Sequence, residues 1–183
     1  MKKRLMLGVV ALGTTLLLMG CPKHDTAASH VDLSSPSKTV TLVTPIHFAK
    51  DSGVRPAIKA ECKLPEKLER FIRQSSAKQN ILVKTSDGPA NQIQGQVLSI
   101  EITQAFGPGG GAYSGAKSVT IGGKLTDGDK VLGTLTARRI SGGGAFASFK
   151  GTCDILGRDV ETLGSDVATF LISPSKGARL GNI

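Results

Sequence analysis

The chain has 183 residues, with 23 Lys and Arg against 14 Asp and Glu, and a formal net charge of +9 at pH 7. The basic residues are scattered and never form a run of five, so we expect no nucleic-acid partner. With no Trp and one Tyr, the core must consist of aliphatic side chains and a few Phe.

The first 20 residues have the pattern of a cleavable export signal. Residues 2–4 are basic, and residues 5–19 are apolar and uncharged. An apolar run of about 15 residues is short for a membrane span and suits a signal peptide. We predict a signal peptide over residues 1–20. The signal peptide contains three basic residues and no acidic one, so the remaining chain has a formal net charge of +6. This positive charge either keeps the protein soluble or attracts anionic envelope material weakly.

The sequence Leu18-Met19-Gly20-Cys21 resembles the lipobox of bacterial type II signal peptides, in which the cysteine sulfur receives a diacylglyceryl group. The resemblance implies cleavage before Cys21, acylation of Cys21 by chains such as palmitate, and stable membrane anchoring. By resemblance to the sorting of Gram-negative lipoproteins, Pro22 in place of Asp implies the outer membrane, with the protein facing the periplasm. The alternative is an ordinary signal peptide that happens to precede a cysteine.

The rest of the chain is predicted to form a tether, one domain and a tail. Residues 21–38 are rich in Ser, Ala and Pro without apolar periodicity, which is typical of a lipidated, flexible tether. In the domain, over residues 39–174, the first expected strand covers residues 39–49, where Pro45 indicates an edge or a bulge. A helix should begin at Pro65, and its apolar side should contain Leu64, Leu68, Phe71 and Ile72.

Four further strands are expected at residues 81–85, 92–106, 117–126 and 131–140, with a tight turn at residues 127–129. Their predicted inward residues are Leu98, Ile100 and Ile102 in one strand and Val119, Ile121 and Leu125 in the next. The clearest pattern is the apolar stripe of a helix over Thr152–Ile172. Gly157 and Gly164 beside this stripe either allow close approach to the sheet or, at Gly164, break the helix. Pro174 ends the helix, and residues 175–183 are assigned to a C-terminal tail.

The order β-α-β-β-β-β-α predicts an α+β fold, a mostly antiparallel sheet of about five strands with two amphipathic helices on one face. Together with the lipobox, this order is similar to small envelope lipoproteins with an anticodon-binding-like α/β fold. A "TDG…R…SGGG…C…L" stretch within residues 90–172 also resembles uncharacterised small outer-membrane lipoproteins. The first resemblance implies an accessory role in assembling or secreting envelope components, and the second implies no activity.

Cys62 and Cys153 remain in the domain after Cys21 is assigned to the anchor. An even pair of cysteines in a small exported domain predicts a disulfide. The alternative is two buried free thiols. No C-x-x-C motif or Cys/His cluster accompanies them, so we expect no metal site.

Two glycine-rich segments, residues 107–115 and 141–145, should lie at the same end of an antiparallel sheet. Aromatic and basic residues near mobile loops form a plausible binding surface. Alternatively, the segments are plain solvent loops and the Phe side chains cap the core. The predicted surface consists of Phe106, Tyr113, Arg138, Arg139, Phe146 and Lys150.

The outward face of the predicted sheet should be rich in Ser and Thr, and it is either solvated or docks a partner. Its expected residues are Ser99, Glu101, Thr103, Ser118, Thr120, Thr134, Thr136 and Arg138.

No catalytic motif stands out in the sequence. The glycines near residue 107 lead into a strand rather than a helix, so they do not form a phosphate loop, and no G-x-S-x-G motif occurs. His47 is the one histidine of the predicted domain and is interpreted as a surface or core residue. We therefore expect a non-enzymatic protein without cofactors, which binds an envelope protein or scaffolds an assembly. The alternatives are a module that binds an anionic envelope polymer or glycolipid and, as a third option, a hydrolase.

Overall fold

The computed structural model describes residues 35–108, 115–141 and 151–183 of the chain. The predicted signal peptide, Cys21 and most of the predicted tether lie outside these residues. The elements are β1 (Lys38–Val43), β2 (His47–Phe48), α1 (Pro56–Glu61), α2 (Leu64–Ala77), β3 (Ile81–Ser86), the 3-10 helix η1 (Ala90–Gln92), β4 (Gln96–Phe106), β5 (Lys117–Asp127), β6 (Lys130–Ser141), α3 (Thr152–Ile172) and β7 (Ala178–Gly181).

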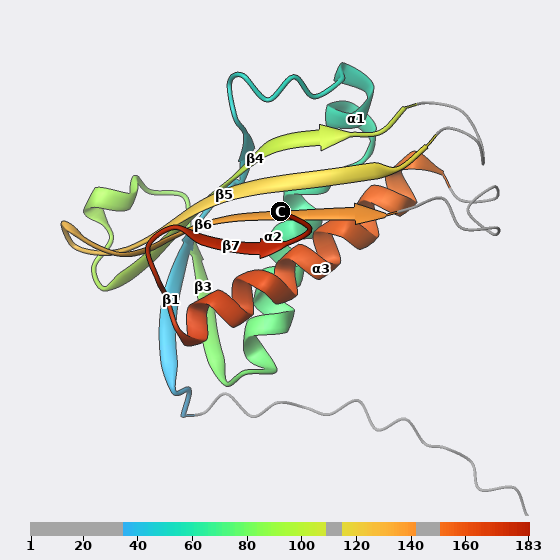
Figure 1. Cartoon of the computed structure of the whole chain (residues 1–183). Coiled ribbons are helices and arrows are strands. Elements are labelled where there is room, and N and C mark those ends of the chain that lie inside the picture. Colours follow the sequence, from blue (N-terminus) through green and yellow to red (C-terminus); the bar gives the residue numbers. More distant parts are fainter. Residues whose placement is uncertain (1–34, 109–114, 142–150) are drawn as a thin grey trace, which may run out of the picture. The chain divides into compact units, whose positions relative to one another are not determined.

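The strands form one mixed sheet in the order β3-β1-β4-β5-β6-β7, and the short strand β2 also pairs with β4 (Figure 1). The strand pairs β4-β5 and β5-β6 are antiparallel, whereas β1 runs parallel to β3 and to β4, and β7 runs parallel to β6. The fold is α+β as expected. The prediction of about five mostly antiparallel strands is wrong, because the described sheet has seven strands and is mixed.

The parallel pairs follow from the connections. Helices α1 and α2 carry the chain from the end of β1 back to the level of its start, so β3 runs beside β1 in the same direction. Strand β4 begins level with the end of β1, where Thr41 lies opposite Val97, and continues in that direction. Strand β7 lies in the segment 175–183 that was assigned to a tail.

The first predicted strand is interrupted at the proline that signalled an irregularity. Strand β1 ends at Val43, and β2 resumes pairing with β4 at His47. Leu42 lies opposite Leu98 and His47 opposite Glu101, so five steps along one strand match three along the other. The segment between β1 and β2 is therefore two residues longer than the stretch of β4 beside it, and it bulges away from β4. Pro45 lies in this segment and has no N–H group with which to continue the hydrogen bonds of the sheet.

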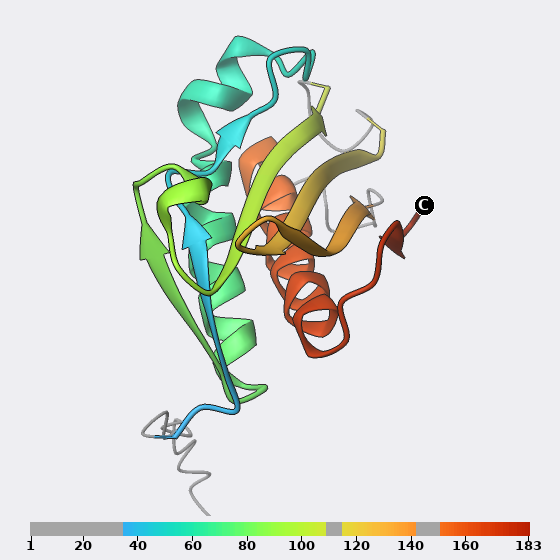
Figure 2. The same cartoon turned by 90° about the vertical axis from the view of Figure 1, so that its left-hand side faces the viewer.

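Helices α2 and α3 lie side by side on one face of the sheet, and in Figure 2 the sheet lies in front of them. The core between the layers is aliphatic, and both predicted sets of inward strand residues are buried. The side chains without any exposed surface include Leu68, Ile72, Leu98, Ile102, Ile121, Leu125, Leu156 and Leu163. The alternating and helical apolar patterns therefore gave the correct inward faces.

Helix α3 runs without interruption through Gly157 and Gly164, so Gly164 does not break it. A Cβ atom at Gly164 would lie 2.7 Å from the backbone carbon of Phe71 and 3.0 Å from the nitrogen of Ile72. Gly164 therefore allows α3 to approach α2, whereas the sequence predicted an approach to the sheet. At Gly157 a Cβ would meet only the end of the Lys67 side chain, at 3.5 Å.

The expected disulfide joins Cys62, directly after α1, to Cys153 in the first turn of α3. Their Cα atoms are 4.8 Å apart, and Cys62 is buried in the core. The bond thus fixes α1 to the start of α3 across 91 residues of sequence.

Asp159 of α3 is a buried carboxylate on the side of the helix that faces the sheet. Its Oδ1 accepts a hydrogen bond from the Ser141 hydroxyl, while its Oδ2 is buried without a partner. Burial raises the pKa of Asp159 to about 6, and the Ser141 hydrogen bond and the nearby Arg158 charge only partly oppose this.

We expect Asp159→Asn to stabilise the protein at pH 7. Because the folded-state pKa lies above that of the unfolded chain, the folded state binds more protons between about pH 4 and pH 6. The free energy of unfolding therefore decreases as pH rises through this window. Above it, the full cost of burying the charged Asp159 carboxylate remains. At pH 7 the free energy of unfolding of Asp159→Asn should exceed that of the native protein by about 1–2 kcal/mol, after allowance for solvent screening. At pH 4 the two proteins should be almost equally stable. Urea unfolding at both pH values tests this, with the exposed Asp129→Asn as control; a gain independent of pH would contradict it.

Candidate binding face of the sheet

The side of the sheet that α2 and α3 leave uncovered is called the open face. Along each strand, residues alternate between the buried side and the open face. The described open-face residues include Thr41, Lys84, Ser99, Glu101, Thr103, Thr120, Gly122, Lys124, Thr134, Thr136 and Arg138. The outward positions that the sequence predicted thus do point away from the long helices.

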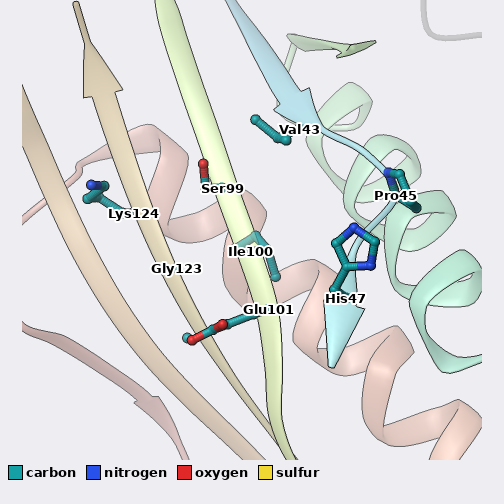
Figure 3. Close-up of a pocket in the computed structure, with 9 residues that line it drawn as sticks. Val43, Pro45, His47, Ser99, Ile100, Glu101, Gly123 and Lys124 are labelled. Carbon is teal, nitrogen blue, oxygen red and sulfur yellow. The ribbon is translucent and has the colours of Figure 1, made fainter. Parts of the chain in front are cut away.

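A pocket of about 440 Å³ opens on this face where the chain breaks between β1 and β2 (Figure 3). The broken strand supplies one wall, β4 crosses the middle and β5 supplies the far side. Its lining combines apolar and polar side chains with two glycines: Val43, Pro45, His47, Ser99, Ile100, Glu101, Gly122, Gly123 and Lys124.

Gly122 of β5 helps to keep this pocket open. Gly122 presents no side chain to the open face, and a Cβ there would lie 3.3 Å from the Thr103 methyl group and 3.9 Å from a Glu101 carboxylate oxygen. Any larger side chain at position 122 would therefore extend into the space between β4 and β5. The sequence signals for this pocket were Pro45 within a predicted strand and the paired glycines within another, which mark interruptions and close approaches.

His47, Ser99 and Glu101 share the pocket, but no hydrogen bond joins any two of them. Figure 3 shows the Glu101 side chain directed toward β5, away from the His47 ring. An activated serine needs a base within hydrogen-bond reach and a third group that orients the base. The described geometry of these three residues does not have that arrangement.

The structure separates the two arginines of the predicted binding surface. Arg138 and Arg139 are neighbours on β6, so their side chains point to opposite faces. Arg139 lies on the helix side, where its Nε donates to Asp166 Oδ2 at 2.8 Å and its Nη2 to Oδ1 at 2.5 Å. This hydrogen bonding raises the pKa of Arg139 and fixes α3 to β6. Phe106, at the end of β4, is 56% exposed.

Tyr113, Phe146 and Lys150 of the predicted surface lie outside the described residues. Among the residues that the structure describes, no three His, Cys, Asp or Glu side chains gather in a group that could hold a metal ion. Within the same residues, no helix is long and apolar enough to cross a membrane.

No family model matches the chain, and no curated protein matches it in sequence. Among solved structures, the chain is similar to the PelC dodecamer from Paraburkholderia phytofirmans (14% identity, 69% of this chain and 86% of that chain, TM-score 0.43). It is also similar to a DUF330 protein from Xanthomonas campestris (15% identity, 75% and 87%, TM-score 0.49) and to lipoprotein GNA1162 from Neisseria meningitidis (13% identity, 72% and 99%, TM-score 0.45). Bacterial lipoproteins are thus among the similar structures, but these values assign neither family nor function.

The open face carries more positive than negative charge. Lys84, Lys124 and Arg138 lie on it, against the single described carboxylate of Glu101. Between these charges the face is dominated by hydroxyl groups of Ser and Thr. Such a surface offers many hydrogen bonds and a weak attraction for anions.

Proposed function

We propose that this protein is a lipid-anchored component of the bacterial outer membrane that faces the periplasm and binds another envelope component through its open face, without catalysis. The anchor is supported by Leu18-Met19-Gly20-Cys21, which resembles a lipobox. The observation that carries the binding role is the pocket of about 440 Å³ on a sheet face that the two long helices leave uncovered. Pockets of this size are typical of binding sites.

The non-catalytic role is supported by the arrangement inside the pocket. Ser99, His47 and Glu101 provide the residue types of a hydrolase but not their hydrogen bonds. The pocket therefore fits a binding module better than a nucleophilic enzyme.

A second candidate function is the binding of an anionic envelope polymer or glycolipid. The excess of Lys and Arg over Glu on the open face, together with its hydroxyl groups, favours this candidate. Binding of this kind should weaken as salt concentration rises, because the charges are exposed.

Site-specific photocrosslinking in cells tests the proposed binding face. We expect a photoreactive residue in place of Lys124, beside the pocket, to capture a defined envelope component. The same residue in place of the exposed Glu161, on α3, should not capture it. Filling the pocket with Gly122→Val should reduce capture from position 124, whereas Thr39→Val, at an exposed β1 position, should leave it unchanged.

The anchor is tested in the same experiment. Cys21→Ser should move the protein out of the outer-membrane fraction and abolish capture if partner binding depends on anchoring. Equal capture from positions 124 and 161, or capture that Gly122→Val does not affect, would reject the open face as the binding surface.

A further inference from the structure

A second arginine lies beside Arg138 on the open face, on the strand that the sequence analysis assigned to a tail. Strand β7 pairs in parallel with β6, so that Thr136 lies opposite Arg179 and Arg138 opposite Gly181. Paired residues share a face, and so do residues two apart on one strand. Arg138 and Arg179 therefore extend from neighbouring strands on the same face, offset by two residues.

The structure holds this segment firmly against β6. Thr134 Oγ1 accepts a hydrogen bond from the nitrogen of Gly177, and the nitrogen of Asn182 donates to the Arg138 carbonyl at 2.8 Å. Gly181 has a φ of +81°, and a Cβ there would lie 2.2 Å from that carbonyl oxygen. Only glycine fits this contact, so the close pairing that places Arg179 beside Arg138 depends on it.

Polar atoms near these arginines are buried without partners. Within the described residues, neither Arg138 nor Arg179 forms an ion pair. Arg138 Nε is buried and has no hydrogen-bond acceptor. Thr120, opposite Arg138 on β5, has a buried hydroxyl that is also without a partner. A buried donor without an acceptor is costly and calls for an explanation, such as a ligand that accepts from it.

The neighbouring Arg139 provides an internal comparison. The fold supplies Asp166 as a two-pronged carboxylate partner for Arg139 on the helix side. Among the residues that the structure describes, no carboxylate partners Arg138 on the open face. Two guanidinium groups on one face without a carboxylate between them repel each other, and a bound anion would offset that repulsion.

We propose that Arg138 and Arg179, together with the Thr120 hydroxyl, form a subsite that binds a phosphate group. Guanidinium groups bind phosphate through paired hydrogen bonds, and two of them plus a hydroxyl match the several oxygens of a phosphate better than the two of a carboxylate. This inference rests on the proposed binding role of the open face. It names the ligand class as a phosphorylated component, such as a phosphorylated glycan or a phospholipid headgroup.

The test uses the full-length lipidated protein in micelles of a neutral detergent, titrated with inorganic phosphate. Binding is followed by NMR signals of the arginine side chains and by calorimetry. We expect saturable binding that Arg138→Gln and Arg179→Gln each weaken by at least about tenfold, because each removes charge-assisted hydrogen bonds. Lys84→Gln, which removes a cation of the same face on the distant edge strand β3, should change the affinity less than about twofold.

Two results would overturn the subsite. One is the absence of saturable phosphate binding to the native protein. The other is an equal loss of affinity in Lys84→Gln and Arg179→Gln, which would show a general charge effect. Arg138→Gln could also disturb the fold, because the Nε atom of Arg138 is buried. The side chain of Arg179 is exposed, so Arg179→Gln tests the subsite without that complication.

Further titrations distinguish the sources of the phosphate group. Binding of glucosamine 1-phosphate but not of phosphatidylglycerol in the micelles would indicate a phosphorylated glycan, and the reverse would indicate a headgroup; either result supports the subsite. Failure of the subsite is separable from failure of the proposed function. Absent phosphate binding leaves crosslinking from position 124 unaffected, whereas absent crosslinking leaves the titration with the purified protein unaffected.

Discussion

Removal of the Cys62–Cys153 disulfide is expected to lower the free energy of unfolding by about 4 kcal/mol. The bond spans 91 residues, and the chain-entropy model assigns a loop of this length about 4–5 kcal/mol of stabilisation through restriction of the unfolded chain. Native domains have a total stability of roughly 5–15 kcal/mol, so the loss is a large part of the whole. The measurement is urea unfolding of the oxidised protein and of the variant with Cys62→Ala and Cys153→Ser.

The choice of residues in this variant matters because the two cysteines have different surroundings. Cys62 is 1% exposed, so alanine there avoids a buried hydroxyl, whereas the half-buried Cys153 tolerates serine. As a reference for the unfolded state without the disulfide, the native protein is first unfolded and then reduced and alkylated. A loss of unfolding free energy below about 1 kcal/mol would contradict the prediction, because it would show that restricting the unfolded chain contributes little net stability.

Gly164→Ala is expected to destabilise the protein by about 2 kcal/mol, although alanine favours helices. The added methyl group would lie 2.7 Å from the Phe71 backbone carbon, and a backbone atom of a packed helix cannot move aside easily. The gain in helix propensity, about 1 kcal/mol, is smaller than the cost of forcing α2 and α3 apart. Thermal and urea unfolding measure the difference.

Gly157→Ala is the matched control, because it introduces the same methyl group into the same helix two turns earlier. There the nearest atom is the end of the flexible Lys67 side chain, at 3.5 Å. The control should therefore gain up to about 1 kcal/mol from helix propensity alone. If both variants gain stability, the close contact between α2 and α3 does not limit the packing.

The elements that the sequence predicted well are those with long and regular apolar patterns. The helix over Thr152–Ile172 was predicted with its observed bounds, and the alternation around Ile100 and Ile121 gave the buried side of β4 and β5 correctly. The pairing of strands was predicted poorly because periodicity shows which face of a strand is buried but not which strand lies beside it. Strand β3 could be placed beside β1 only by knowing how α1 and α2 return the chain.

The candidate site was predictable only in part, for a related reason. The adjacent Arg138 and Arg139 of a strand necessarily point to opposite faces, but the sequence does not show that Asp166 occupies one of them. Arg179 lies in a short segment with Gly on both sides, which has no alternating pattern to suggest a strand. Its pairing with β6 depends on backbone contacts, such as the hydrogen bond from Asn182 to the Arg138 carbonyl, that no composition rule predicts.

The disulfide also decides what a single cut in the backbone would do. Both glycine-rich segments, residues 107–115 and 141–145, fall between Cys62 and Cys153 in the chain. A protease that cleaves once in either segment would produce two fragments that remain joined through sulfur, and a non-reducing gel would show one band where a reducing gel shows two. The chain can thus lose continuity at either segment while Cys21 stays covalently connected to α3 and β7.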